Sequence, residues 1–267
     1  GLGIMGAPMA QNLLKAGFGL KVYNRSDRPR VQEVDYEGKK GLINAYGLPG
    51  KGVEGLIKSL KASQFMSDKR IVGLSIGGHC VDDYLQVVSR LEEAFFDKKK
   101  LYYELNISCP NTPEGQSLLT HPELFESLLV QMRALTAKPI GIKLSPDQSN
   151  KSIYGYVDMI RSLDDVYVNL GNTQLKHCHE VGLDKKAIAI GKGGLSGPAL
   201  FERTLEMVRL VAPLKVPIMA TGGIDSVAKM IALQEAGASL FGLATALVTD
   251  LYCIPKLNAQ WARYQGA

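Results

Sequence analysis

After residue 65, short apolar runs alternate with longer segments in which apolar residues recur at helical spacing. Short runs rich in β-branched side chains are typical of buried strands, and the longer pattern is typical of helices that pack on one face. The predicted strands are 71–75, 102–105, 139–144, 166–170, 217–220 and 240–243. The predicted helices are 81–94, 122–135, 151–163, 198–211, 226–236 and 254–264.

This alternation predicts a parallel sheet with helices outside it, because consecutive parallel strands need a crossover connection. Eight such units close into a TIM-type (β/α)8 barrel. The six predicted strands and a further strand at 20–23 make seven, one fewer than the barrel needs. We therefore expect the first strand to be missing or replaced. Residues 191–197 are rich in glycine and are predicted to form a loop.

The front of the chain has a different pattern. Gly1-Leu2-Gly3-Ile4-Met5-Gly6 is a GxGxxG motif, followed by a helical run at 7–16 and the apolar run 20–23. Such glycines permit a tight turn beside a pyrophosphate, but the motif is weak evidence without a preceding strand. Residues 1–26 resemble the N-terminal fragment of the β-hydroxyacid dehydrogenases, which implies NADP. We therefore predict a Rossmann-like β-α-β fragment at 1–26 and a barrel at 27–267.

Two asparagines flank a thiol just after the predicted strand 102–105, in Asn106-Ile107-Ser108-Cys109-Pro110-Asn111-Thr112-Pro113-Glu114-Gly115. A loop at a strand end is where an α/β barrel holds its chemistry. The carboxamides can donate and accept hydrogen bonds to a flat polar substrate, and Cys109 can exchange a proton. The alternative is an ordinary loop with a buried thiol.

Two glycine turns each precede a predicted helix. They are Gly193-Gly194-Leu195-Ser196-Gly197 and Thr221-Gly222-Gly223-Ile224. Glycine loops and helix N-termini present backbone N–H groups to anions, so the pair predicts a phosphate cradle, which Ala244 and Thr245 would close. Either turn alone would be a simple turn.

In order along the chain, these motifs resemble the dihydroorotate dehydrogenases. The resemblance includes 43–49, 106–115, 141–146, 172–173, 193–197 and 220–224. A cysteine in the substrate loop is similar to the class 1 branch. The resemblance implies FMN as cofactor and the oxidation of (S)-dihydroorotate to orotate in pyrimidine biosynthesis.

It also implies roles for individual residues. Cys109 would be the base, and Lys143 would lie near the flavin N1–C2 edge. The substrate would be held by Asn44, Asn106, Asn111, Asn172 and Thr173. The cofactor phosphate would be held by Gly194, Gly197, Gly222, Gly223, Ala244 and Thr245.

Two features depart from the family pattern. The small Ala-Ser-Gly turn after the first strand has no counterpart, and Asn24-Arg25-Ser26 replaces the lysine after the second strand. A guanidinium is not equivalent to that ammonium. Two alternatives therefore stay open: a catalytically inactive flavin-binding or structural barrel, and an NADP-dependent hydroxyacid dehydrogenase.

Composition further limits the class of protein. The 46% hydrophobic and 21% charged residues are ordinary for a globular protein of 267 residues, and the net charge of +5 is too small to predict nucleic-acid binding. No apolar run is long enough to span a membrane. The four cysteines form no CxxC pair, which argues against a metal site and favours free thiols in the cytoplasm. A homodimer is possible.

Overall fold

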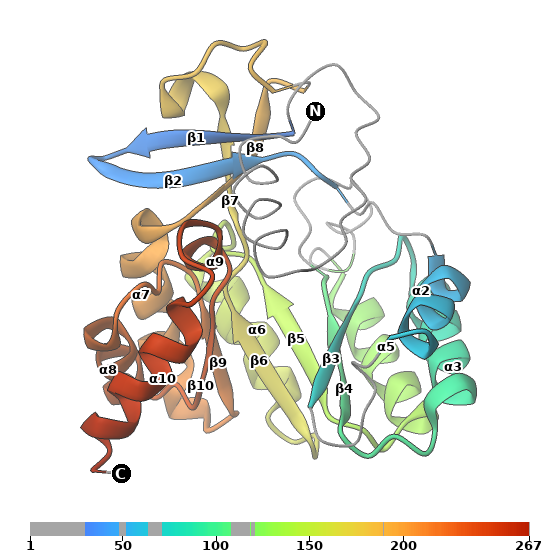
Figure 1. The fold of residues 1–267 in the computed structure, drawn as a ribbon. Coiled ribbons are helices and arrows are strands. Elements are labelled where there is room, and N and C mark those ends of the chain that lie inside the picture. Colours follow the sequence, from blue (N-terminus) through green and yellow to red (C-terminus); the bar gives the residue numbers. More distant parts are fainter. Residues whose placement is uncertain are drawn as a thin grey trace. The chain divides into compact units, whose positions relative to one another are not determined.

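The computed structural model describes residues 30–47, 52–63, 71–107, 118, 121–188 and 190–266. The chain forms two compact units (Figure 1). Unit 1 comprises Gly1–Tyr46, Leu170–Ala212 and Ile218–Ala267, and unit 2 comprises Gly47–Asn169 and Pro213–Pro217. The predicted elements at 7–16 and 20–23 lie outside the described residues, as do Cys109 and Asn111.

Unit 2 is built on parallel strands in the order β3-β4-β5-β6. These strands are β3 (Val72–Ile76), β4 (Leu101–Leu105), β5 (Ile140–Leu144) and β6 (Val166–Leu170), whose last residue belongs to unit 1. The helices of the unit are α2 (Gly52–Lys61), α3 (Val81–Phe95), α5 (Pro122–Leu135) and α6 (Asn150–Ile160). The predicted alternation of strands and helices is confirmed, and the bounds of α5 and β6 agree with the prediction at both ends.

The two faces of β4 carry different side chains. Leu101, Tyr103 and Leu105 are fully buried, whereas Tyr102 and Glu104 on the other face are partly buried. Helix α3 buries one stripe at helical spacing, made of Tyr84, Val88, Leu91 and Phe95. The Tyr103 hydroxyl donates to Glu92 of α3 at 2.9 Å, so this face of β4 is the one that contacts α3.

On the opposite face, tyrosine rings lie across glycines of neighbouring strands. A Cβ on Gly73 would come within 2.2 Å of the Tyr102 ring, and one on Gly141 would come within 2.2 Å of the Tyr167 ring. The Tyr102 and Tyr167 rings meet edge to face, with centroids 5.9 Å apart. Glycine is therefore required at both positions because the ring occupies the space of a side chain.

Glu92 is the centre of a partly buried polar network on the helix side of the sheet. Its carboxylate accepts hydrogen bonds from Tyr103 and Thr136 and forms a 2.7 Å ion pair with Lys138. Burial raises the pKa of Glu92, but the hydrogen bonds from Lys138, Thr136 and Tyr103 outweigh it and hold that pKa below its usual value. The network ties α3 to β4 and to the end of α5.

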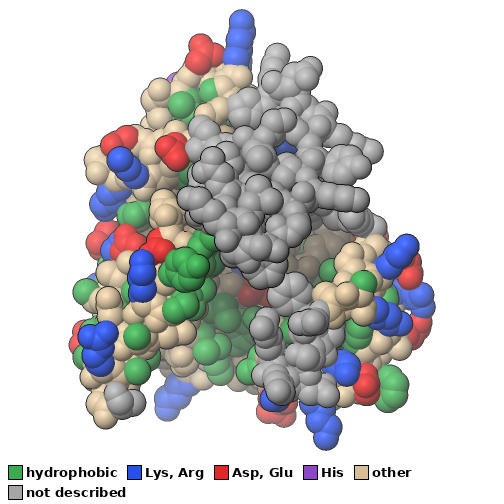
Figure 2. All heavy atoms as spheres, in the orientation of Figure 1, with side chains coloured by type: hydrophobic (Ala, Val, Ile, Leu, Met, Phe, Trp, Pro, Cys, Tyr) green, Lys and Arg blue, Asp and Glu red, His purple; other side chains and the backbone are tan. Residues whose placement is uncertain are grey.

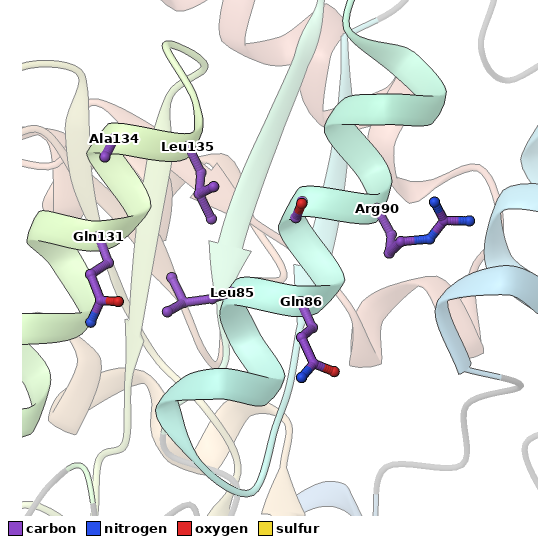
Figure 3. Close-up of a pocket in the computed structure, with 7 residues that line it drawn as sticks. Leu85, Gln86, Arg90, Gln131, Ala134 and Leu135 are labelled. Atoms are coloured by element: carbon purple, nitrogen blue, oxygen red, sulfur yellow. The ribbon is translucent and has the colours of Figure 1, made fainter.

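Outside the sheet, a surface depression of about 520 Å³ lies between α3 and α5 (Figure 3). Leu85 points toward α5, whereas Arg90 points away from it. The depression is lined by Leu85, Gln86, Ser89, Arg90, Gln131, Ala134 and Leu135. None of the residues predicted to bind substrate or cofactor is among them.

Unit 1 contains an antiparallel sheet in the order β1-β2-β8-β7. Its strands are β1 (Val31–Tyr36), β2 (Lys39–Asn44), β7 (Gln174–His177) and β8 (Lys192–Ser196). The sequence prediction did not include this sheet. A small core stabilises it, made of Val34, Ile43, Cys178, Val181, Ile188 and Leu195.

The prediction of a loop at 191–197 was wrong, because β8 occupies Lys192–Ser196. Glycine is unfavourable in a strand, but here close neighbours require it. A Cβ on Gly193 would lie 2.5 Å from the Asn44 carbonyl oxygen, and one on Gly194 would lie 2.0 Å from Thr173 Oγ1. Contact with neighbouring strands therefore outweighs local propensity.

The rest of unit 1 is a parallel pair, β9 (Ile218–Thr221) and β10 (Leu240–Gly242), with helices α7 (Phe201–Val211), α8 (Val227–Glu235), α9 (Thr245–Thr249) and α10 (Cys253–Tyr264). Short 3-10 turns occupy Cys178–Val181, Pro198–Leu200 and Ala212–Leu214. Charged side chains of both signs are interspersed over the described surface in Figure 2, in keeping with the small net charge. Within the described ranges, no helix has the length and apolar character needed to cross a membrane.

The Gly141 contact gives a stability prediction. Gly141→Ala should destabilise the protein by about 1–3 kcal/mol, because the new methyl group displaces the Tyr167 ring. The matched control is Gly155→Ala in α6, where a Cβ has open space; it should stabilise by about 0.5–1 kcal/mol. Urea unfolding measures both, and a Gly141→Ala variant as stable as the parent would contradict the ring placement.

The Glu92 network gives a pH prediction. Because the folded protein holds the pKa of Glu92 below its usual value of 4.5, its contribution to stability is complete above that pH and is lost as the pH falls further. Glu92→Gln should therefore lower stability at neutral pH and make the acid loss shallower. Glu93→Gln, an exposed neighbour on α3, should change neither much. Equal pH profiles of unfolding for the parent and Glu92→Gln would contradict the assignment.

Candidate functional site

The turn after β9 in unit 1 is pressed against the start of α7. Gly222 has φ 141° and Gly223 has φ 72°, both in the region that favours glycine. A Cβ on Gly222 would lie 2.4 Å from Thr204 Oγ1, and one on Gly223 would lie 2.5 Å from the Phe201 nitrogen. The turn thus has a fixed backbone path that other residues cannot follow without strain.

Lys229 of α8 holds the same turn from another side. Its Nζ donates to the Gly223 carbonyl oxygen at 2.9 Å and to Asp225 at 2.9 Å. The ammonium also lies 5.1 Å from the centroid of the Phe201 ring. These contacts fix the peptide after Gly223, and the Asp225 carboxylate offsets the charge of the lysine.

The second glycine turn follows β8. Gly197 has φ 113°, and a Cβ there would lie 3.0 Å from Gly41 Cα. Just before it, Ser196 Oγ accepts a hydrogen bond of 2.9 Å from Thr245 Oγ1 at the start of α9. The end of β8 and the start of α9 are therefore joined, as expected for two parts of one cradle. Ala244, the residue before α9, is exposed.

Three predicted substrate residues of unit 1 lie around β8. Asn44 at the end of β2 donates from Nδ2 to the Gly194 carbonyl oxygen at 3.1 Å. Thr173 lies against Gly194 and donates from its backbone nitrogen to Asn172 Oδ1 at 2.9 Å. The structure thus brings Asn44 and Thr173 to Gly194, which is a predicted cofactor residue.

Thr221 presents a polar atom that the protein does not satisfy. Its Oγ1 is buried and has no hydrogen-bond partner, and a Cβ on Gly242 would lie 2.1 Å from it. Buried hydroxyl groups are nearly always hydrogen-bonded, so an orphan next to the Gly222–Gly223 turn is the kind of group that a polar ligand satisfies.

In unit 2, Asn106 follows the end of β4. Its backbone nitrogen donates to the Ile76 carbonyl oxygen at 2.8 Å, and its carbonyl oxygen accepts from the Tyr84 hydroxyl at 3.2 Å. Lys143 of β5 is half-buried. The strand pairs Glu104–Gly141 and Leu105–Ile142 place Asn106 beside Lys143 when they are extended by one step.

Sequence reasoning missed three residues on this same face of the sheet. Glu104 accepts hydrogen bonds from the Tyr167 hydroxyl at 3.1 Å and from Asn169 Nδ2 at 2.8 Å. Burial and the Glu104 carboxylate raise the pKa of Tyr167, so its hydroxyl stays protonated and remains the donor. The sequence signal for two of them was a charged residue, Glu104, and an amide, Asn169, each within an otherwise apolar strand. The same kind of signal had identified Lys143.

The residues of unit 1 fit the phosphate of FMN. Two constrained glycine turns, a serine–threonine pair and an unsatisfied buried hydroxyl lie at or next to the ends of β8 and β9. Parallel β/α barrels hold phosphate groups at the carboxyl ends of their strands. Fold and site together define a β/α-barrel protein of the phosphate-cofactor-binding class.

Comparison with known proteins identifies the family. The family model described as dihydroorotate dehydrogenase matches residues 21–263, and the chain belongs to this family. A Shouchella clausii protein named "Dihydroorotate dehydrogenase B (NAD(+)), catalytic subunit" is 31% identical over 234 residues, which cover 87% of this chain and 74% of the relative. An Anoxybacillus flavithermus protein of the same name is 30% identical over 262 residues, covering 97% and 79%.

A solved structure shows the same fold. The crystal structure of DHODH from Eimeria tenella in complex with ferulenol has a TM-score of 0.71 and 19% sequence identity, covering 98% of this chain and 78% of that chain. The predicted α/β fold of TIM-barrel type is confirmed. Family membership also confirms the oxidoreductase class, dihydroorotate oxidation and FMN as the cofactor.

The cradle gives a binding prediction. Gly222→Asp should abolish FMN retention, because its carboxylate repels the phosphate in addition to straining the turn. Gly222→Ala carries the strain and the contact with Thr204 without the charge, so it is the matched control.

The measurement is the affinity of each variant for FMN and for riboflavin, which lacks the phosphate. Relative to Gly222→Ala, the Asp variant should lose FMN affinity selectively. If both variants lose the two ligands equally, the phosphate does not lie at this turn.

Proposed function

We propose that the chain oxidises (S)-dihydroorotate to orotate with FMN held by unit 1 through the glycine turns of β8 and β9. The observation that carries this assignment is the cluster around Gly194, where Asn44 and Thr173 adjoin the β8 end of the cradle. Family membership supports the substrate.

The residue roles in this proposal are those that the resemblance to the family implies, and the chemistry of each side chain suits its role. When bound, the flavin supplies the acceptor for a hydride. Asn44, Asn106, Asn111, Asn172 and Thr173 would hold the flat substrate ring and its carboxylate through carboxamide and hydroxyl groups. Cys109 would accept the proton from the ring carbon, and Lys143 would place its positive charge beside the flavin.

The electron acceptor is proposed from the relatives' names. Those relatives are named as catalytic subunits of an NAD(+) enzyme, so we infer that a second subunit passes electrons from this chain to NAD+. A homodimer of the catalytic chain and a cytoplasmic location are part of the same proposal. The thiols of Cys80, Cys178 and Cys253 are free, as a reducing compartment would keep them.

For the N-terminal segment, we propose an origin in a β-hydroxyacid dehydrogenase-like fragment. Its support is the GxGxxG of Gly1–Gly6 and the family match that begins at residue 21. An inactive flavin-binding barrel stays the alternative, because Asn24-Arg25-Ser26 replaces the family lysine.

Cys109 gives the catalytic prediction. Cys109→Ala should slow flavin reduction by dihydroorotate by about 10²–10⁴-fold, the usual contribution of a positioned base, with flavin content unchanged. Cys109→Ser should retain some activity at higher pH, because a hydroxyl gives up its proton less readily than a thiol. Stopped-flow reduction of the bound flavin measures both rates.

The matched control is Cys80→Ala, the same substitution at an exposed cysteine before α3, which should leave the rate unchanged. Fast reduction in Cys109→Ala would remove this residue from the mechanism. Binding of FMN without reduction in the parent would instead favour the inactive barrel, and exchange of residues 1–26 for a family-like segment would then test whether turnover returns.

A further inference from the structure

A partly buried carboxylate, that of Glu104, lies on the sheet of unit 2 without a role in the mechanism above. A single oxygen of Glu104, Oε2, accepts both the Tyr167 hydroxyl at 3.1 Å and Asn169 Nδ2 at 2.8 Å. Both donors come from β6, so their side chains cross β5 to reach β4. The absence of a side chain at Gly141 makes this crossing possible, since a Cβ there would lie 2.2 Å from the Tyr167 ring.

The strand register places this group close to Lys143. Glu104 pairs with Gly141, so Lys143 lies one row further along β5 on the same face. In the pair Tyr103–Ile140, the Tyr103 nitrogen donates to the carbonyl oxygen of Pro139, the residue before its partner. The Ile140 nitrogen donates to the Asp165 carbonyl oxygen in the same way. By the same relation Ile140 pairs with Val166, and Lys143 stands beside Asn169.

Asn169 has a fixed orientation in this arrangement. Its Nδ2 donates to Glu104, so its Oδ1 cannot be directed at the same carboxylate oxygen. Asn169 is 4% exposed, and its Oδ1 has no hydrogen-bond partner. An unsatisfied buried carbonyl is costly, so its position beside a lysine marks it as an acceptor for a donor on this face.

We propose that Glu104 is a positioning residue that acts through Asn169 and through its own charge on Lys143 and on the flavin ring beside it. The inference rests on the proposed function of Lys143. The carboxylate holds the Asn169 carbonyl toward the lysine. Its negative charge, on the same face as the Lys143 ammonium, opposes the effect of that ammonium, which favours the entry of electrons into the flavin ring. Glu104 and Lys143 together then set the reduction potential of the bound flavin.

No other charge shares this face among the described strand residues of unit 2. The remaining titratable groups are Tyr102 on β4 and Tyr167 on β6. Burial and the Glu104 carboxylate raise the pKa of each, so both are neutral. Apart from Lys143, which the proposal includes, no other charged strand residue described on this face complicates the measurement.

The test is Glu104→Gln. Glutamine keeps one acceptor oxygen for Tyr167 and Asn169 but removes the charge. The ratio of reduced to oxidised bound FMN at a fixed solution potential should rise about tenfold, which for a two-electron couple is a positive shift of about 30 mV. The matched control is Glu92→Gln, which removes a partly buried carboxylate on the opposite side of β4 and should leave the potential unchanged.

A second measurement needs no flavin. Acylation of lysines in the apoprotein is followed at a fixed pH by mass spectrometry. In Glu104→Gln, the labelling rate of Lys143 should rise about tenfold relative to the parent, because the negative charge on its face is gone. In Glu92→Gln, the residue whose labelling rate changes should be Lys138, the ion-pair partner of Glu92.

Unchanged Lys143 labelling in Glu104→Gln, or an equal change in both variants, would overturn the inference. The same reduction potential for bound FMN in the parent and in Glu104→Gln, when both hold FMN, would also overturn it. A parent that holds no FMN would count against the proposed function instead, while the labelling of Lys143 would still decide the role of Glu104.

Discussion

Close approach of neighbouring segments at glycine is the constraint on which both units depend. In unit 1 it presses Gly194 against Thr173 and Gly223 against Phe201, and in unit 2 it lets the Tyr167 ring cross Gly141. Each contact removes the space of a Cβ. Because interiors are close-packed, an added methyl group at any of these points must move a strand, a turn or a ring. The positions of the polar groups at the strand ends follow from these contacts.

The same packing places two partly buried carboxylates on opposite faces of one strand. Tyr103 and Glu104 are adjacent in β4 and point to opposite faces, so Glu92 lies on the helix side and Glu104 on the inner side. Glu92 has a lysine partner at 2.7 Å and behaves as a structural ion pair. Glu104 accepts hydrogen bonds from the neutral donors Tyr167 and Asn169. Its charge is therefore stabilised in place but less fully offset, which lets it act on groups further along the face.

The sequence predicted the elements whose signal is local. Helix α5 and strand β6 have the expected bounds because a proline start, an apolar stripe and a β-branched run are each contained within the element. Strand β8 was missed because its glycines serve contacts with β2 and Thr173, which are distant in sequence. The β1–β2 hairpin has a local signal, Glu37-Gly38, which takes positive φ at both residues, but its strands alternate too weakly to be recognised.

The residues of the candidate site likewise divide into those with a local sequence signal and those that depend on contacts distant in sequence. The turn at Gly222 and Gly223 was predictable because a glycine pair after a strand and before a helix is a contiguous motif, and its role in cofactor binding stays a prediction. The bond between Glu104 and Asn169 joins residues 65 positions apart, and it depends on the register of three strands. What the sequence did contain was the anomaly of a polar side chain in an apolar strand. At Lys143 this signal led to a predicted role. The strand register shows that polar residues of β4, β5 and β6 have to be considered together, because a charge within one strand requires partners in the strands beside it.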